Sequence, residues 1–303
     1  MSVLDQPRWA FVALATPVHV EADGGLGPDV GRLASLARDM LAAGCNGVVP
    51  FGTTGEGPCF SVAQRTATLD GLIAAGVPAD RIIVGIGATA LADSVALARH
   101  AAGHGCPVLA PPPFFLRTAD EAGIVAAIGR LVDEVADPRL RVLVYNIPQV
   151  SGFAIPPVAL QALAAAHPGI VVAVKDSCPV WEPVEAVLHA RGPLRIAVGA
   201  EAFIARAMAL GGVGTICGMA NLAPATAART VAGDAGAAAG LARLAALFEN
   251  RPFLPLMKAA LAVLRDDPAW RLPMPPLSPL DPPAVEAVVA LARDLEAAAA
   301  AMA

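Results

Sequence analysis

The chain has 303 residues, of which 56% are hydrophobic and 16% charged, and its formal net charge is −5. The charged fraction is too low for a disordered chain, and the acidic balance offers no electrostatic footprint for nucleic acid or an anionic membrane. The five cysteines are scattered and form no CxxC pair. This argues against a disulfide framework and predicts a protein of the reducing cytoplasm.

Two long segments without charged residues, 142–174 and 207–228, raise the question of a membrane span. Prolines, glycines and polar residues interrupt both segments. Buried strands of a parallel sheet also read as continuous apolar runs. We therefore predict a buried sheet and no contact with a membrane.

Short apolar runs alternate along the chain with longer stretches rich in alanine and leucine. The expected strands are 11–15, 47–50, 81–85, 108–110, 141–145, 170–175, 195–198 and 214–217. The expected helices between them are 30–43, 62–75, 91–102, 121–135, 158–166, 180–189 and 203–210. This rhythm predicts an α/β fold, a (β/α)8 TIM barrel. A doubly wound sheet is the alternative, but its first strand usually leads into a glycine turn, whereas here it leads into Thr16-Pro17.

The strand pattern stops at Pro224. The remainder reads as four helices, 225–232, 235–248, 255–264 and 283–302. We therefore expect a barrel over residues 1–224 and a C-terminal helical extension over residues 225–303.

Chemistry in such barrels sits at the carboxyl ends of the strands. Lys175 ends the apolar run 171–174, and the chain has only one other lysine, Lys258. A lysine amine in a barrel mouth can attack a carbonyl carbon and form a Schiff base; the alternative is a solvated lysine. Tyr145, the sole tyrosine, ends the preceding strand. Its phenol could move a proton, or it could be a packing residue.

A glycine-flanked turn, Gly52-Thr53-Thr54-Gly55, follows the second strand. Its hydroxyls and amides could bind a carboxylate or phosphate, or it could be an ordinary turn before a helix. The turn lacks the lysine of a P-loop. Gly199 and Glu201 follow the seventh strand and are expected at the same mouth.

Two other patterns point to cofactors or metals but lack support. The GxGxxA pattern at residues 85–90 is followed by no acidic residue that could bind a ribose, so no dinucleotide cofactor is predicted. His100 and His104 are four residues apart with Cys106 nearby. The glycines beside them indicate a helix end away from the catalytic face, so we expect solvated histidines and no metal site.

Taken together, the motifs resemble the family of dihydrodipicolinate synthase and N-acetylneuraminate lyase, in order and along nearly the whole chain. The matching segments are GTTGE at 52–56, GIGAT at 85–89, PPFF at 112–115, YNIP at 145–148, VKDS at 174–177, GGVG at 211–214, NLAP at 221–224 and RLP at 271–273. The resemblance implies a (β/α)8 barrel with a helical extension, assembled as a homotetramer or homodimer. It also implies that Lys175 forms a Schiff base with pyruvate or another 2-oxo acid, that Tyr145 transfers protons, and that Thr53 and Thr54 hold the carboxylate.

Three positions depart from the family pattern. Phe115 stands where the synthase has a second tyrosine that enters a neighbour's site, and Val150 stands where the synthase has an arginine for the carboxylate of aspartate semialdehyde. Gly218 stands where the lyase has a serine that contacts the sugar chain. Glu201 could replace that hydroxyl ligand, or it could be an acid near a helix N-terminus.

The sequence therefore predicts a class I aldolase or lyase acting on pyruvate and an aldehyde, with a 2-keto-3-deoxy sugar acid as the preferred substrate. The alternatives are a dehydratase or hydratase with the same Schiff-base chemistry, dihydrodipicolinate synthase itself, and a non-catalytic protein that binds 2-oxo acids.

Overall fold

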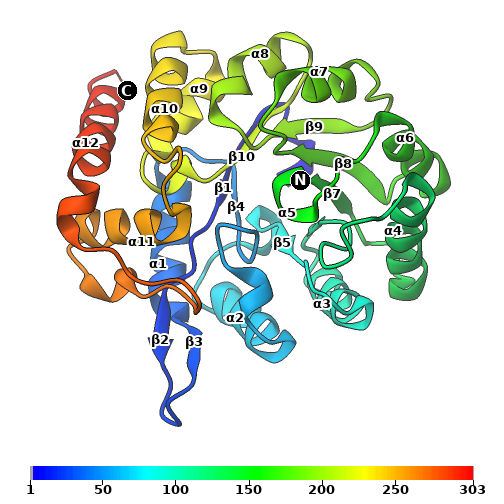
Figure 1. The fold of residues 1–303 in the computed structure, drawn as a ribbon, viewed down its shortest axis with the longest axis horizontal. Helices are drawn as coiled ribbons and strands as arrows, with labels where there is room; N and C mark the ends of the chain where they lie inside the picture. The colour runs from blue at the N-terminus through cyan, green and yellow to red at the C-terminus, as the bar shows by residue number, and fades with distance from the viewer. Residues whose placement is uncertain (1–2, 303) are drawn as a thin grey trace.

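The computed structural model describes residues 3–302, and its centre is a barrel of eight parallel strands (Figure 1). The strand order in the sheet is β4-β1-β10-β9-β8-β7-β6-β5. A parallel bridge between Val48 and Ile82, with Ile83 N–H donating to Val48 O over 3.0 Å, joins the two ends. The strands are β1 Trp9–Ala13, β4 Gly47–Val49, β5 Val84–Gly85, β6 Val108–Ala110, β7 Val142–Asn146, β8 Val171–Asp176, β9 Arg195–Val198 and β10 Gly214–Cys217. The predicted (β/α)8 barrel is confirmed.

Helices surround the barrel and bury one apolar face each. They are α1 Val30–Ala42, α2 Val62–Ala74, α3 Leu91–Gly103, α4 Glu121–Val135, α6 Pro157–Ala166, α7 Trp181–His189 and α8 Ile204–Ala209. Side-chain caps define the N-termini of α1, α2 and α4. Asp29, Ser61 and Asp120 each accept a hydrogen bond from a backbone N–H of the first turn of their helix. The barrel interior is filled by its own cluster of large side chains, which includes Trp9, Phe11 and Leu143.

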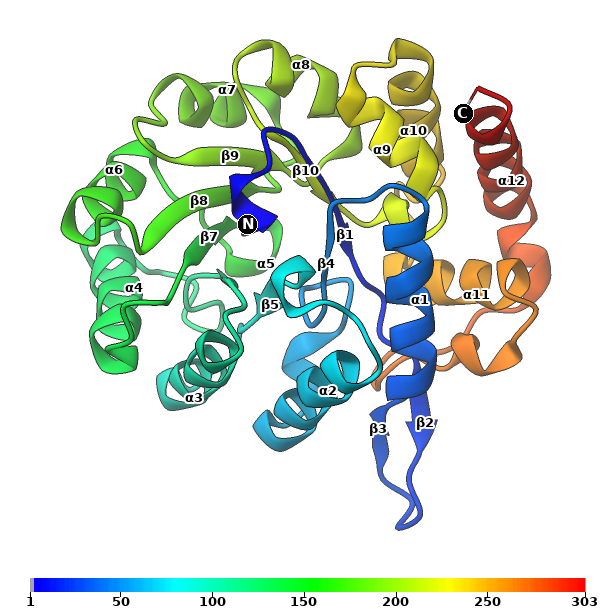
Figure 2. The ribbon, with the colours of Figure 1, turned by 180° about the vertical axis from the view of Figure 1, so that it is seen from behind.

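The C-terminal part adds α9 Pro224–Ala232, α10 Ala235–Ala246, α11 Phe253–Leu264 and α12 Glu286–Ala300 on one side of the barrel (Figure 2). Helix α9 contacts β1 and α8, while α11 and α12 lie farther out. The division into residues 1–224 and 225–303 stays a prediction. No helix of residues 3–302 is long and apolar enough to cross a membrane.

Several predicted boundaries are wrong by a few residues. Strand β1 ends before Ala15, because Ala15 N–H donates to the Asn221 side chain instead of to a neighbouring strand. Residues 79–81 form a 3-10 turn, so the third expected strand begins only at Val84. The helix expected over 203–210 is α8 preceded by a 3-10 turn, Glu201–Phe203, and the last helix begins with another 3-10 turn, Pro282–Val285. Helix α11 begins two residues early, at Phe253, and α10 ends at Ala246.

A β-hairpin and a one-turn helix are missing from the predicted set. An antiparallel hairpin of β2 Val18–Val20 and β3 Leu26–Pro28 projects from the molecule beside α1 (Figures 1 and 2). The Asp23-Gly24-Gly25 sequence at its tip, with Gly24 at a φ of 85°, is a turn signal that could have found it. A one-turn helix, α5 Pro148–Ser151, follows β7 directly.

Candidate active site

All of the predicted site residues line one cavity at the carboxyl ends of the strands. The cavity has a volume of about 590 Å³, within the range of small-molecule sites. The predicted residues that line it are Thr53, Thr54, Tyr145, Val150, Lys175, Gly199 and Glu201. The barrel thus brings together positions at the carboxyl ends of β4, β7, β8 and β9 that lie up to 148 residues apart in the sequence, from 53 to 201.

Lys175 lies on β8 directly opposite Tyr145 on β7 in the strand register. Its side chain is only 4% exposed, and its Nζ lies 4.2 Å from the centroid of the Tyr145 ring. No side chain or carbonyl of residues 3–302 accepts a hydrogen bond from this Nζ, although the Glu201 carboxyl is close enough to interact with its charge. The amine is therefore held in a narrow place and is free to react with a carbonyl carbon.

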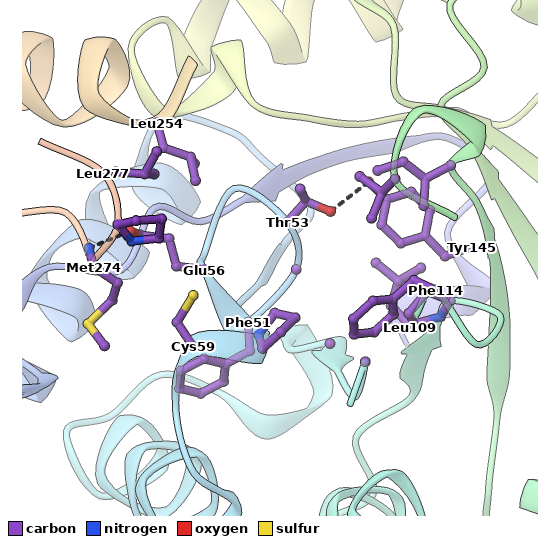
Figure 3. Close-up of a pocket in the computed structure, with 18 of the residues that line it drawn as sticks. Phe51, Thr53, Glu56, Cys59, Leu109, Phe114, Tyr145, Leu254, Met274 and Leu277 are labelled. Carbon is purple, nitrogen blue, oxygen red and sulfur yellow. Dashed lines mark hydrogen bonds between the residues drawn. The ribbon is translucent and has the colours of Figure 1, made fainter. Parts of the chain in front are cut away.

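The Tyr145 hydroxyl points from β7 toward the turn that follows β4. Its Oη lies 3.4 Å from Thr53 Oγ1, and Figure 3 shows this contact as a dashed line. The ring is buried with 5% exposure, but the hydroxyl reaches the lining of the cavity. The phenol is therefore beside the Lys175 amine and can exchange a proton with a group bound to it.

Two non-glycine residues in the left-handed region bracket the turn after β4. Phe51 has a φ of 59° and Glu56 a φ of 54°, a conformation that costs non-glycine residues of order 1–3 kcal/mol and clusters at functional sites. Within the described chain, the backbone N–H groups of Thr53 and Thr54 donate to no protein acceptor. The turn thus presents two free amides, and the hydroxyls of Thr53 and Thr54, at the cavity, as carboxylate binding requires.

Glu201 lies at the start of the 3-10 turn after β9, but its side chain does not cap that turn. Its Oε1 instead accepts a hydrogen bond of 3.0 Å from Met219 N–H. Burial raises the pKa of the Glu201 carboxyl above 4.5, while the hydrogen bonds and the Lys175 charge partly oppose the shift. Glu201 is thus an acid in the first turn of a helical element, as one of the two sequence interpretations has it, and its carboxyl also lies close enough to Lys175 to interact with its charge.

Asn146 and Asp176, the residues after Tyr145 and Lys175, form a buried scaffold behind the site. Asn146 Nδ2 donates to Asp176 Oδ2 over 3.1 Å, and Asn146 Oδ1 accepts from Ile155 N–H. Asp176 Oδ1 accepts from Cys178 N–H, and burial raises the pKa of the Asp176 carboxyl. These bonds fix the ends of β7 and β8, and with them the relative positions of Tyr145 and Lys175.

Two glycines at the mouth, Gly199 and Gly218, leave room for neighbouring side chains. A Cβ on Gly199 would lie 1.9 Å from Ser177 Oγ, so this glycine lets the Ser177 hydroxyl lie against the loop after β9. A Cβ on Gly218 would lie 2.8 Å from Cζ of Phe253 at the start of α11. The phenyl ring therefore takes the space that the side chain of a serine would need.

Residues of the C-terminal extension complete the mouth, although no sequence motif pointed to them. Phe253, Leu254 and Leu277 line the cavity around Lys175. A second, nearly apolar chamber of about 220 Å³ opens beside Thr53 and Tyr145 (Figure 3). Side chains that line this chamber include Phe51, Leu109, Phe114, Leu254, Met274 and Leu277.

Val150 lies on α5 and lines both spaces, with 38% of its surface exposed. Its neighbour Ser151 is buried and donates to the carbonyls of Ile147 and Phe153, so its hydroxyl holds the loop and not a ligand. His100 and His104 do not line the mouth; they lie at the end of α3 and contact Asp70, which sequence reasoning missed. The cavity around Lys175 thus has polar walls on the β8 and β9 side and apolar walls toward the extension.

Residues 8–292 match the family model described as the dihydrodipicolinate synthetase family. The chain belongs to this family. A protein of Chloroflexus aurantiacus named an uncharacterized DapA-like lyase is 38% identical over 289 residues, which cover 90% of this chain and 93% of that protein. The crystal structure of dihydrodipicolinate synthase from Agrobacterium tumefaciens has a TM-score of 0.85 at 29% identity and covers 95% of this chain and 99% of that one.

A further relative in the dihydrodipicolinate synthetase family is the Escherichia coli protein YagE, named a putative 2-dehydro-3-deoxy-D-gluconate aldolase. It is 26% identical over 289 residues, which cover 90% of this chain and 93% of YagE. The present protein is a lyase of the class I aldolase type, in agreement with its family and its named relatives.

Proposed function

We propose that the protein is a class I aldolase that uses Lys175 to form a Schiff base with a 2-oxo acid and cleaves it to pyruvate and an aldehyde. The observation that carries this proposal is the position of Lys175 Nζ. It lies 4.2 Å from the centroid of the Tyr145 ring, in a cavity that Thr53 and Thr54 also line. A 2-keto-3-deoxy sugar acid is the preferred substrate class, and the name of the E. coli relative supports it.

In the proposed reaction, Lys175 Nζ attacks the substrate C2 carbonyl, and water leaves as the iminium forms. Tyr145 Oη donates its proton to the leaving hydroxyl as the iminium forms, and the phenolate that remains accepts the proton of the C4 hydroxyl. The C3–C4 bond then breaks, and its electron pair moves into the iminium to give an enamine. The aldehyde departs. Protonation at C3 and hydrolysis of the iminium then release pyruvate and free Lys175. Thr53 and Thr54 hold the carboxylate through the free amides and hydroxyls of their turn.

The test is reduction with borohydride in the presence of pyruvate, followed by peptide mass spectrometry. The proposal predicts a stable adduct on Lys175, and none on Lys258, whose side chain is completely buried against Glu56. A protein that merely binds 2-oxo acids gains no adduct. An adduct on Lys258, or none at all, would contradict the mechanism, and Lys175→Arg provides the unlabelled control.

The apolar chamber favours a second candidate, an aldehyde with an apolar substituent. The chamber joins the site at Thr53 and Tyr145, and its side chains offer a sugar chain few hydrogen-bonding partners. Pyruvate release from 2-keto-3-deoxygluconate can be compared with condensation of pyruvate and benzaldehyde. Faster turnover of the aromatic aldehyde would favour this candidate, and the opposite order would favour the sugar acid. A dehydratase would instead give a product that keeps all substrate carbons.

We also propose a homotetramer or homodimer in the cytoplasm. Phe115 and Leu116, in the loop after β6, expose 74% and 69% of their surfaces beside the mouth, and a second copy could cover them. All five cysteines are free, as in proteins of a reducing compartment. Sedimentation of the wild type and of Phe115→Ser/Leu116→Ser tests the assembly, because the proposal expects the variant to dissociate more easily.

A further inference from the structure

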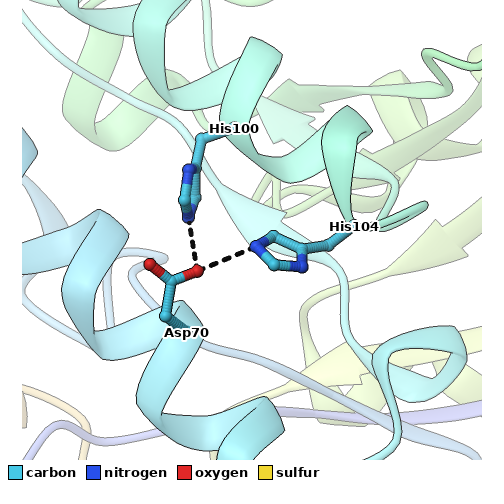
Figure 4. A group of neighbouring side chains, drawn as sticks. All are labelled: Asp70, His100 and His104. Carbon is cyan, nitrogen blue, oxygen red and sulfur yellow. Dashed lines mark hydrogen bonds and ion pairs between the residues drawn. The ribbon is translucent and has the colours of Figure 1, made fainter.

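A cluster of three potential metal ligands lies on the outside of the barrel, between α2 and α3. Figure 4 shows the imidazoles of His100 and His104 turned toward the carboxylate of Asp70. His100 Nε2 lies 2.9 Å and His104 Nε2 2.8 Å from the same oxygen, Asp70 Oδ1. All three donor atoms lie within 4.8 Å of one another.

Local structure explains why these side chains converge. His100 is in the last turn of α3, and His104 is the residue directly after that helix, where its own N–H bonds to the carbonyls of Ala101 and Ala102. A spacing of four residues places both rings on one side of a helix. The rings are 4.9 Å apart between centroids and inclined at 70°, so they do not stack, and both present Nε2 to the same point. Asp70 reaches this point from the neighbouring helix, α2.

We propose that Asp70, His100 and His104 bind a divalent transition-metal ion of the zinc class. Two imidazole nitrogens and one carboxylate oxygen are a frequent donor set for zinc, cobalt and nickel. Donor atoms around tetrahedral zinc are about 3.3 Å apart, from bond lengths near 2.0–2.1 Å. The present separations from Asp70 Oδ1 are close to that value, so small side-chain rotations make room for an ion.

The surroundings leave the ion accessible. The side chains of His100, His104 and Asp70 are 29%, 35% and 52% exposed. Water can therefore reach the ion and fill the remaining coordination position. No cation of the described residues forms an ion pair with Asp70 apart from these two histidines. The carboxylate is thus not committed to an arginine or lysine that a metal would have to displace.

The position in the fold indicates what the ion would do. The two histidines lie at the C-terminal end of α3, which in a (β/α)8 barrel faces the end opposite the catalytic mouth. None of the three ligands lines the cavity around Lys175. An ion here would link α2 to α3 and stabilise the barrel without taking part in the reaction.

The test uses the full chain, freed of metal by chelation and dialysis. Cobalt titration followed by visible absorption, and zinc titration followed by calorimetry, should each show one ion bound per chain. The cobalt complex should give the d–d spectrum of a four-coordinate site. Zinc should raise the midpoint of thermal unfolding by several degrees, because it binds the folded state. Pyruvate-dependent activity should not change.

The variants His100→Gln, His104→Gln and Asp70→Asn should each weaken binding by at least about tenfold, and the double histidine variant should lose it. His189→Gln, an exposed histidine on α7, is the matched control and should bind as the wild type does. Circular dichroism checks that each variant folds. The proposal is wrong if the wild type binds no ion at micromolar concentrations, or if the double variant binds as tightly as the control.

Discussion

Glu56 and Lys258 form an ion pair in which both side chains are completely buried. Glu56 ends the threonine turn after β4, whereas Lys258 lies in the middle of α11. Glu56 Oε1 also accepts from Met274 N–H over 2.7 Å, and Lys258 Nζ donates to Leu272 O over 2.9 Å. The pair therefore fastens the turn that carries Thr53 and Thr54 to the C-terminal extension.

Lys258→Met should destabilise the protein strongly, because it leaves the Glu56 carboxyl buried without its partner. Loss of one member of a buried pair typically costs about 3–5 kcal/mol of the free energy of unfolding. The double variant Glu56→Gln/Lys258→Met should recover part of this loss. Denaturant unfolding measures both effects. Arg130→Ala, which breaks an exposed pair with Glu134, should change the free energy of unfolding by less than about 0.5 kcal/mol. A cost as small for Lys258→Met would contradict the structural role of the pair.

Tyr145→Phe should keep the Schiff base but lose turnover. The substitution removes the hydroxyl 3.4 Å from Thr53 Oγ1 and leaves the ring over the Lys175 amine. A positioned proton-transfer group contributes about 10² to 10⁴ in rate. Steady-state assays of pyruvate release measure the loss, and borohydride trapping shows whether the adduct still forms. Turnover near that of the wild type would assign Tyr145 to packing.

Glu201→Gln should change how stability depends on pH. Burial raises the pKa of Glu201 above 4.5, so the folded state binds more protons than the unfolded state in the range just above pH 4.5. The wild type should therefore lose stability relative to Glu201→Gln as pH rises through that range, at no more than about 1.4 kcal/mol per pH unit. Thermal unfolding of both proteins from pH 3.5 upward measures the difference. Glu134→Gln, at a more exposed carboxyl, is the control, and parallel curves for wild type and Glu201→Gln would show that the burial of Glu201 has no such cost.

The protein should be a poor dihydrodipicolinate synthase. Val150 offers only methyl groups to the carboxylate of aspartate semialdehyde, and desolvating a carboxylate without a partner is costly. Phe115 carries no proton for a relay. Arg117 is a cation in the same loop as Phe115, and its guanidinium lies against Gly152, where a Cβ would be 2.5 Å from Arg117 Nε.

A coupled assay with pyruvate and aspartate semialdehyde should give turnover below about 1 s⁻¹. Val150→Arg should raise it, because an arginine can pair with the carboxylate. Turnover in the ordinary enzyme range for the wild type would mean that Arg117, or another group, replaces the missing arginine. Arg117→Ala in the same assay identifies that case.

The sequence by itself determined the fold class, because eight apolar runs alternating with amphipathic helices admit few arrangements other than a parallel barrel. It also predicted that Lys175, Tyr145 and the threonine turn lie together, since residues at the carboxyl ends of barrel strands must meet at one mouth. The placement needed only local pattern and the geometry of the barrel, whereas the roles proposed for these residues rest on the family resemblance.

Only the tertiary structure decided which residues complete the site. Phe253 and Leu277 come from segments with no strand rhythm, and the side chain of Phe253 reaches the mouth because the first residue of α11 lies beside Gly218. No motif in the sequence pairs Lys258 with Glu56, which lies 202 positions earlier in the chain. Only the folded structure brings the two side chains together. Asp70 joined His100 and His104 for the same reason: contacts between helices depend on packing angles and side-chain rotamers, which periodicity in one chain does not encode.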